Sequence, residues 1–499
     1  MLLLSACQTT QTPTAAPTIL STPTLTPEPP ITFPANINPL TGLPVNDPAL
    51  LKVPALLISI SNFPAYGRPQ AGLSFAPFVY EIYITEGATR FLAVFYGQYP
   101  APEIPITGDC AVRSGAFAQA QDMIGGRAWF DANGNSIRDT NESGIGGVCV
   151  NLYDLSGNPL QQTTTDSNGY YGFNVQPGKY MVQFIKPSWL DFAKQNAGDA
   201  SIDSNADPVT GLAEADVESN VLSLDAGLIP SSNATPTPNP ALYLPAAQVG
   251  PIRSGRLIYA YISQFFENSC LIYAFASEEV LVRLPQCHMV FHQVSGGGYM
   301  MDIREMKDVA EANQSQKGSN FDYASNLFSE APPSGGAPGI QLKAYIAYQN
   351  QSAWIYDPLY QSYLRYTDTT EYSEAGVLHP DTDRLTGRQL HFENVIVLFA
   401  KHDVISPTNL DIHLDQGLKG DALLFRDGQT FKIKWSTRAA DDRNKNRSTH
   451  PIIFLAADGE PFPLKPGHTW ILVVTPETTV DEISTGIWQL QFSFPPGAK

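Results

Sequence analysis

Residues 131–142, DANGNSIRDTNE, constrain the fold of this chain most strongly, because oxygen-bearing residues recur in them at a fixed spacing. Asp, Asn and Glu side chains stand at loop positions 1, 3, 5, 9 and 12, and position 7 can offer its backbone carbonyl. The set is Asp131, Asn133, Asn135, Ile137, Asp139 and Glu142. Position 6 is Ser136 and not the usual glycine, so the turn must be made differently. The spacing predicts a Ca²⁺ site; the alternative is a surface loop rich in Asx turns.

The N-terminal residues indicate a cell-envelope location. Residues 4–7, LSAC, look like a bacterial lipobox, in which Cys7 receives a lipid; the alternative is a chance LSAC. The Thr/Pro-rich, nearly uncharged residues that follow have the composition of an extended stalk. We therefore expect a signal remnant at 1–7, a stalk at 8–37, and a membrane partner bound through the lipid on Cys7. This protein would face the extracytoplasmic side.

Composition limits the remaining possibilities. A chain of 499 residues suggests two to four domains, and its net charge of −18 argues against nucleic acid as a partner. No segment approaches the eighteen apolar residues of a membrane-spanning helix. Besides Cys7, the cysteines are Cys110, Cys149, Cys270 and Cys287, which allow three disulfide pairings in an oxidising compartment. The most local pairing joins Cys270 to Cys287.

The order of segments indicates an insertion. Residues 55–61, 78–84 and 89–96 are β-rich runs, and residues 123–229 then change character. This segment holds 13 Asp and Glu against 5 Lys and Arg, a net charge of 5 − 13 = −8, and has short alternating strands separated by turns. After a Thr/Pro linker, the composition again resembles that of the residues before the acidic segment. The segments on both sides therefore belong to one kind of domain, and the acidic segment is inserted into it.

The pattern predicts a multidomain chain: a discontinuous α+β host, an inserted all-β Ig-like sandwich and a smaller β-rich C-terminal piece. Helices are expected after Ser254 and over residues 302–313 and 321–329, and buried strands over 395–400 and 471–474. The expected boundaries are 38–108 for the first part of the host, 123–229 for the insertion, 230–243 for the linker, 244–399 for the second part of the host, and 400–482 for the C-terminal piece.

The acidic segment resembles the B domain of serine-aspartate-repeat surface adhesins (SdrD B-like), a calcium-loaded Ig-like module. The motifs are the loop at 131–142, GGVCVNLYD at 146–154, TDSNGYYGF at 165–173 and PGKYMV at 177–182. The resemblance implies a second calcium site at a matching acidic cluster, Asp199, Asp203, Asn205 and Asp207. A solvated acidic loop is the alternative for that cluster.

The flanking segments resemble the YerB-type family of bacterial lipoproteins, whose domain has no assigned activity. The shared phrases include NPLTGLP at 38–44, RPQAGLSFAPFVYE at 68–81, HFENVIVL at 391–398, LLFRDGQTFKIKW at 423–435 and DGEPFPLKPGHTWILVV at 458–474. This resemblance brings no catalytic residues with it.

Charged residues beside apolar strands of the host have two interpretations. They can form a structural ion-pair network, or Arg68, Arg90, Arg253 and Arg365 can line an anion-binding cleft. His288 and His292 are too far apart on a strand for one metal ion. A further group, His379, Asp381 and Asp383, is either a turn or a set of acid–base groups.

Two functional hypotheses follow. The first is a non-catalytic binding or scaffolding lipoprotein of the envelope with an extracellular or envelope ligand, whose calcium-stiffened module serves as spacer or adhesion surface. The second is an enzyme that acts on an envelope polymer through an Arg/His/Asp cleft in the host. That enzyme would gather Arg68, Glu81, Arg90, Arg253, His379 and Asp381 around one pocket.

Overall fold

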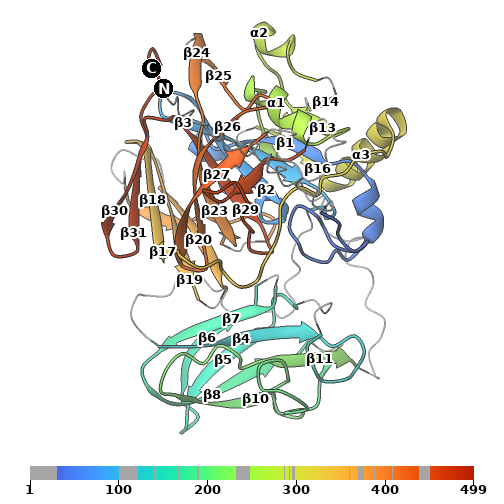
Figure 1. The fold of residues 1–499 in the computed structure, drawn as a ribbon. Helices are drawn as coiled ribbons and strands as arrows, with labels where there is room; N and C mark the ends of the chain where they lie inside the picture. The colour runs from blue at the N-terminus through green and yellow to red at the C-terminus, as the bar shows by residue number, and fades with distance from the viewer. Residues whose placement is uncertain are drawn as a thin grey trace, which may run out of the picture.

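The computed structural model describes residues 31–100, 122–139, 142, 144–166, 168–187, 190–231, 248–285, 287–290, 293–294, 298–358, 360–368, 376–386, 389–406, 408–437 and 450–498. This part of the chain is mostly β-structure arranged in several sheets (Figure 1). Its α-helices are α1 (Ile258–Phe265), α2 (Glu278–Leu281) and α3 (Ile303–Lys317), and 3-10 turns lie at Pro48–Lys52, Ala65–Gly67 and Leu73–Phe75. None of the described helices is both long and apolar enough to cross a membrane.

Strands from both sides of the module share one sheet. The strands before the module are β1 (Leu56–Ser61), β2 (Phe78–Thr85) and β3 (Ala88–Phe95). β1 pairs antiparallel with β12 (Gln248–Ile252) and parallel with β13 (Cys270–Tyr273), and β2 pairs parallel with β29 (Thr469–Val474). The predicted β-rich runs are therefore strands, and their apolar side chains form the buried core of the host.

The same sheet continues through most of the C-terminal half. Its other strands are β14 (His288–Met289), β15 (Gln293–Val294), β16 (Gly298–Asp302), β17 (Ala337–Pro338), β23 (Asn394–Phe399), β26 (Lys419–Arg426), β27 (Gln429–Ser436) and β28 (Ile453–Leu455). This differs from the expected separate C-terminal piece at 400–482, because β26, β27 and β29 are hydrogen-bonded into the host sheet. Long-range strand pairing, which local sequence does not encode, decides that boundary.

A second host sheet and a hairpin lie beside the first. The sheet contains β18 (Gln341–Ala347), β19 (Asn350–Asp357), β20 (Ser362–Asp368), β21 (Leu378–Pro380), β22 (His391–Phe392), β30 (Thr479–Ser484) and β31 (Ile487–Gln491). The hairpin consists of β24 (His402–Ser406) and β25 (Asn409–Ile412).

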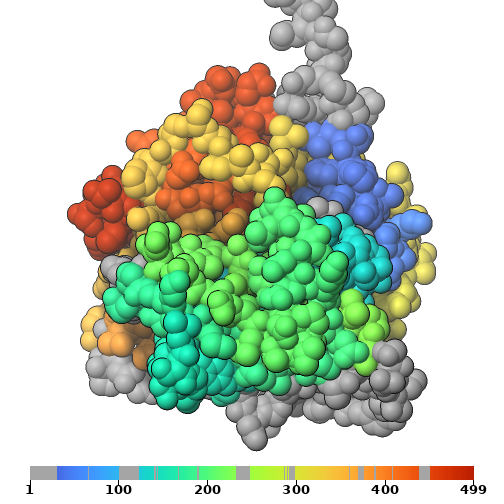
Figure 2. Space-filling view, turned by 90° about the horizontal axis from the view of Figure 1, so that it is seen from below, coloured from blue at the N-terminus to red at the C-terminus, as the bar shows by residue number. Residues whose placement is uncertain are grey.

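The module consists of two four-stranded sheets with a core of their own. One sheet has the order β10-β8-β5-β6 and the other β7-β4-β11-β9. The strands are β4 (Asp122–Phe130), β5 (Cys149–Asp154), β6 (Pro159–Thr164), β7 (Tyr170–Val175), β8 (Gly178–Ile185), β9 (Leu190–Phe192), β10 (Leu212–Val217) and β11 (Ala226–Pro230). Their inward side chains form a core separate from that of the host. The module lies below the host in Figure 1 and fills the centre of the face seen in Figure 2.

The helix predictions are correct in part. Helix α3 is present and begins after Asp302, whose side chain accepts the Arg304 amide. The helix predicted over 321–329 is wrong, because buried side chains there bond to distant backbone. The Tyr323 hydroxyl donates to the Glu267 carbonyl, and the Asn326 amide to that of Ile452. Ser254 does not cap α1, whose N-cap is Leu257.

One of the three possible disulfide pairings is present among the described residues. Cys270 on β13 is bonded to Cys287, with Cα atoms 5.3 Å apart. Cys7, Cys110 and His292, together with most of the expected stalk and Thr/Pro linker, lie outside the described residues.

Candidate functional site

The predicted cation loop is wrapped around the carboxylate of its first residue. Asp131 follows directly after β4 and is fully buried. Its carboxylate accepts the backbone amides of Gly134 at 2.7 Å, Asn135 at 3.2 Å and Ser136 at 2.8 Å. These bonds fix the tight turn that a twelve-residue cation loop requires.

The last residue of the loop closes it onto the first turn. Glu142 is buried, and its two carboxylate oxygens accept the amides of Ala132 at 2.9 Å and Asp139 at 3.1 Å. Between these ends, the side-chain amides of Asn133 and Asn135 both donate to Oδ2 of Asp139, at 2.7 and 3.0 Å. Because an amide can rotate by half a turn, the same two side chains can present oxygens to a cation.

Ser136 takes the backbone conformation that a glycine usually provides at position 6 of such a loop. It adopts a left-handed conformation with φ of 65°, as Gly134 does with φ of 71°. The Ser136 hydroxyl accepts the Lys194 amide at 3.0 Å, which holds that turn in place. The loop thus reaches the required shape without a glycine at position 6.

The residues of this loop fit a hard cation by their chemistry. They supply carboxylates at both ends and amides between them, and Ca²⁺ takes ligands of these types. Within the described ranges, no group of three or more His, Cys, Asp or Glu side chains is placed to hold a metal ion. The predicted ligand set therefore depends on the Asn oxygens and the Ile137 carbonyl as well as on carboxylates.

The second predicted cluster has a different arrangement. Asp199 and Asp207 each accept amides within their own exposed turn, from Ser201 and from Val209 and Thr210. Asp203 is buried, and Asn205 accepts the Asp225 amide at 2.7 Å. The first loop and this segment also touch, since Ile137 and Asp203 form a backbone bridge. Cation binding at the second cluster stays a prediction.

Asp225, which sequence reasoning missed, lies between the two segments. It is buried, accepts the Arg127 amide at 2.7 Å and lies 3.7 Å from Nε of Arg138. Burial raises the pKa of Asp225 to about 7, and the charge of Asp203 acts in the same direction, whereas Arg138 opposes the shift. The module thus holds a carboxylate whose ionisation depends on nearby positive charge.

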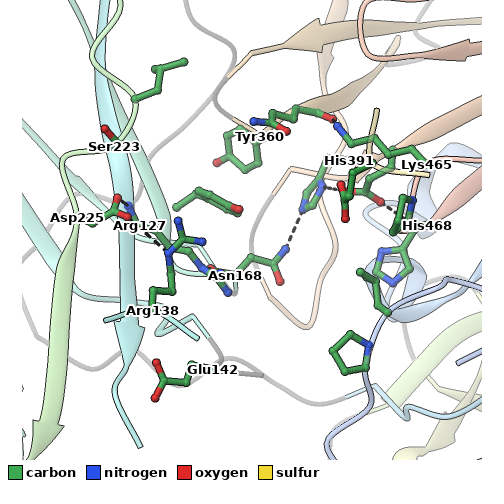
Figure 3. A pocket seen from close by; sticks show the side chains of 18 of the residues that line it. Arg127, Arg138, Glu142, Asn168, Ser223, Asp225, Tyr360, His391, Lys465 and His468 are labelled. Carbon is green, nitrogen blue, oxygen red and sulfur yellow. Dashed lines mark hydrogen bonds and ion pairs between the residues drawn. The ribbon is translucent and has the colours of Figure 1, made fainter. Parts of the chain in front are cut away.

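A cleft of about 910 Å³ separates the module from the host and is lined by both (Figure 3). Glu142 from the cation loop and Asp225 line it on the module side, and His391 and His468 line it on the host side. The two sides touch where the Asn168 amide approaches Nε2 of His391 at 3.4 Å. The rings of Tyr170 and Tyr360 also meet, with centroids 6.0 Å apart.

His391 and Glu393 lie beside each other in this cleft. Nδ1 of His391 lies 3.6 Å from Glu393, whose second oxygen accepts the His468 amide at 2.5 Å. Burial alone would lower the pKa of His391, but Glu393 outweighs it and raises that pKa. Burial likewise works to raise the pKa of Glu393, and the two histidines lower it. The signal in the sequence was the alternation His-Phe-Glu, which places His391 and Glu393 on one side of an extended segment.

The host interior contains a buried ion-pair network around Arg365. Its guanidinium is ion-paired with Asp381 and lies 3.7 Å from Glu81. It also packs against the rings of Trp470, Phe91 and Trp354, 4.5 to 5.4 Å from their centroids. Arg68 lies 3.9 Å from Asp368 and donates to Thr367. Two of the four arginines predicted to bind an anion are thus paired with carboxylates.

The other two arginines lie on the opposite face of the sheet. Side chains alternate along a strand, so Phe91 faces Arg365 while Arg90 points away from it. The charges of Arg253 and Arg256 act on Arg90 there. One cleft lined by all four arginines is therefore wrong, because the sheet separates them into two pairs.

Asp383 and His288, two of the remaining candidates, have partners within the host. Asp383 accepts the amides of Gly72 and Ser74 at 2.9 Å each, so it clamps the loop before β2. His288 lies 3.5 Å from Glu305 on α3. The group at 379–383 thus contributes carboxylates that join distant parts of the host.

Family models match three parts of the chain. The N-terminal domain of DUF3048, a family of proteins of unknown function, matches residues 40–121, and its C-terminal domain matches 342–471. The SdrD B-like domain matches residues 122–228, between the two. The matches support a YerB-type domain that carries an SdrD B-like module. Both resemblances expected from the sequence are confirmed.

Proteins similar to part of this chain include two from staphylococci. A fibrinogen-binding protein of Staphylococcus epidermidis is 39% identical over 92 residues, 18% of this chain and 8% of that protein. Serine-aspartate repeat-containing protein C of Staphylococcus aureus is 38% identical over 111 residues, 22% of this chain and 11% of that protein. The matches thus cover a small part of the relatives' length. The crystal structure of YerB from Bacillus subtilis aligns with a TM-score of 0.44 and 17% identity, over 88% of this chain and 96% of that one.

Replacing Asp381 with Asn should destabilise the host strongly, because it removes the charge that Arg365 needs in a buried site. We expect a loss of about 3–5 kcal/mol in the free energy of unfolding, measured with urea. Asp302→Asn is the matched control: Arg304, its partner, is exposed, and Asn is an equally good N-cap. Equal, small effects of both substitutions would contradict the role given to the Arg365 network.

Asp225→Asn should change how stability depends on pH in calcium-free buffer. The pKa of Asp225 is raised to about 7 in the folded protein. Its protonation therefore stabilises the folded state fully below about pH 4, and this stabilisation is lost as pH rises through 7. The Asn variant keeps an acceptor for the Arg127 amide without that loss. It should be more stable than the wild type at pH 8 by on the order of 2 kcal/mol. Urea unfolding at pH 5 and pH 8 measures this, with exposed Asp216→Asn as control; a variant that follows the wild-type pH curve would refute it.

Proposed function

We propose that this protein is a non-catalytic binding protein of the bacterial cell envelope, anchored by a lipid on Cys7. A discontinuous α+β host would carry a calcium-braced module as spacer or adhesion surface. The observation that carries the proposal is the loop at 131–142 within an SdrD B-like domain. Its first and last carboxylates, Asp131 and Glu142, are both buried and fixed by backbone amides.

The role proposed for calcium is mechanical. Without a cation, the carboxylates of the loop and of Asp203 and Asp225 repel one another inside the module. A bound Ca²⁺ would offset this repulsion and stabilise only the folded state. Because Glu142 and Asp225 also line the cleft, the same ion would stiffen the side of the module that faces the host.

The relatives support one class of ligand. One of them is named for binding fibrinogen, so we propose a protein ligand outside the cell for this module as well. The cleft between module and host would either fix the angle at which the module is presented or take part of the ligand.

The enzyme hypothesis has less support. It required the host arginines, Glu81, His379 and Asp381 to share one pocket. Arg365 and Glu81 instead belong to a buried ion-pair network, and Arg90 faces the other side of the sheet. This arrangement favours a structural role for those charges over acid–base chemistry.

The calcium proposal is tested on the full-length chain by calorimetric melting. Extracellular calcium sites typically have Kd values of ~10⁻⁴–10⁻³ M. At about 10 mM calcium the module should therefore gain roughly 1.4–2.7 kcal/mol over the chelated protein. This corresponds to a rise of about 5–15 °C in the Tm of its transition. Asp131→Ala combined with Glu142→Ala should abolish the rise.

Asp154→Ala is the matched control. Asp154 also accepts the amides of its own turn, from Ser156 and Asn158, but in a loop without the cation spacing. It should keep the calcium response. A response that persists in the double variant, or none in the wild type, would sink the calcium proposal.

A further inference from the structure

The loop at 131–142 contains an Asn-Gly pair, Asn133-Gly134, both residues of which are exposed. Apart from the chain neighbours of Gly134, no atom of the described residues lies within 4 Å of the place where a Cβ on this glycine would stand. A glycine also leaves its backbone free to rotate, because it carries no side chain. The backbone nitrogen of Gly134 can therefore approach the side-chain amide of Asn133 without a steric barrier from the rest of the described chain.

Three hydrogen bonds supply the groups that such an approach needs. The Gly134 amide donates to the Asp131 carboxylate at 2.7 Å, so the nitrogen has a base beside it. The side-chain oxygen of Asn133 accepts the Asn135 amide at 2.9 Å, which polarises the carbonyl and stabilises negative charge on its oxygen. The side-chain nitrogen of Asn133 donates to Asp139 at 2.7 Å. These partners fix the orientation of the side-chain amide, because an ionised carboxylate only accepts and an N–H only donates.

The second Asn-Gly pair of the module, Asn168-Gly169, has different surroundings. The Gly169 amide donates to the backbone carbonyl of Asp166 at 2.9 Å, and the Gly169 carbonyl accepts the Ala128 amide at 2.8 Å. A Cβ on Gly169 would lie 2.1 Å from the carbonyl oxygen of Ala128, so this backbone is packed tightly against β4. The two pairs thus share a dipeptide, but only the Gly134 amide donates to a carboxylate.

We propose that Asn133 is a site of self-catalysed deamidation, in which Asp131 acts as the general base. The backbone nitrogen of Gly134 forms a bond to Cγ of Asn133 and passes its proton to the Asp131 carboxylate. The bond between Cγ and the side-chain nitrogen then breaks, and this nitrogen takes up the proton and leaves as ammonia. Water opens the remaining cyclic imide at either of its carbonyl groups and yields aspartate or isoaspartate.

The product changes the charge of the loop. Asp131, Asp139 and Glu142 already supply three carboxylates there, and deamidation adds a fourth at position 3. The Asn133 side chain also loses the N–H that it donates to Asp139. The reaction needs no cation, so it is independent of the calcium proposal and is tested without calcium.

The test follows the full-length chain in chelator and mildly alkaline buffer by peptide mass spectrometry, which detects the replacement of NH₂ by OH. One sample is kept folded and a second is unfolded in urea. In the folded chain, Asn133 should be deamidated at least about tenfold faster than Asn168, since a positioned base contributes roughly 10²–10⁴-fold. In urea, where the contacts of both pairs are lost, the two rates should become similar.

Asp131→Asn keeps an acceptor for the Gly134 amide but cannot take its proton, so it should slow deamidation of Asn133 by about tenfold or more. Asp154→Asn, in another turn whose amides the carboxylate accepts, is the matched control and should leave that rate unchanged. The proposal is overturned if folded wild type deamidates Asn133 no faster than Asn168, or if urea leaves their ratio unchanged. A folded Asp131→Asn variant that reacts as fast as the wild type also overturns it. If this variant does not fold, the comparison of the two pairs in the wild type decides.

Discussion

Burial of the Arg365 guanidinium is the constraint on which the host fold depends. A cation between three aromatic rings needs carboxylates, and these come from opposite sides of the module: Glu81 on β2 before it, and Asp381 after it. Asp383 adds a second clamp across the same gap by binding the amides of Gly72 and Ser74. The chain must therefore return to the host after the module. The pairing of β1 with β12 and β13, which follow the module in the sequence, requires the same return.

Features that are local in sequence could be predicted, and those that depend on long-range contacts could not. The apolar runs of β1 to β3 and the Asp302 cap of α3 are encoded within a few residues. Calcium binding by the loop at 131–142 stays a prediction. The face on which Arg90 lies depends on strand register and on which sheet covers each side. The cleft was missed for the same reason, because its residues come from segments as distant as Asn168 and His391. The extended path of 321–329 is set by bonds to residues far along the chain.

The module and the host each contain a cluster of like charges. In the module, carboxylates crowd around the loop at 131–142, and burial keeps the pKa of Asp225 near neutrality. In the host, arginines crowd around Arg90.

The most direct test of the central claim, that calcium braces the module, is hydrogen exchange of the full-length chain followed by mass spectrometry. With calcium present, amides of peptides covering 131–142 and the adjoining strands β4 and β11 should exchange more slowly than in chelator. Peptides of β1, β2 and β3 in the host should exchange at unchanged rates. Identical exchange of the module in both conditions would contradict the claim and leave the loop as a turn without a bound ion.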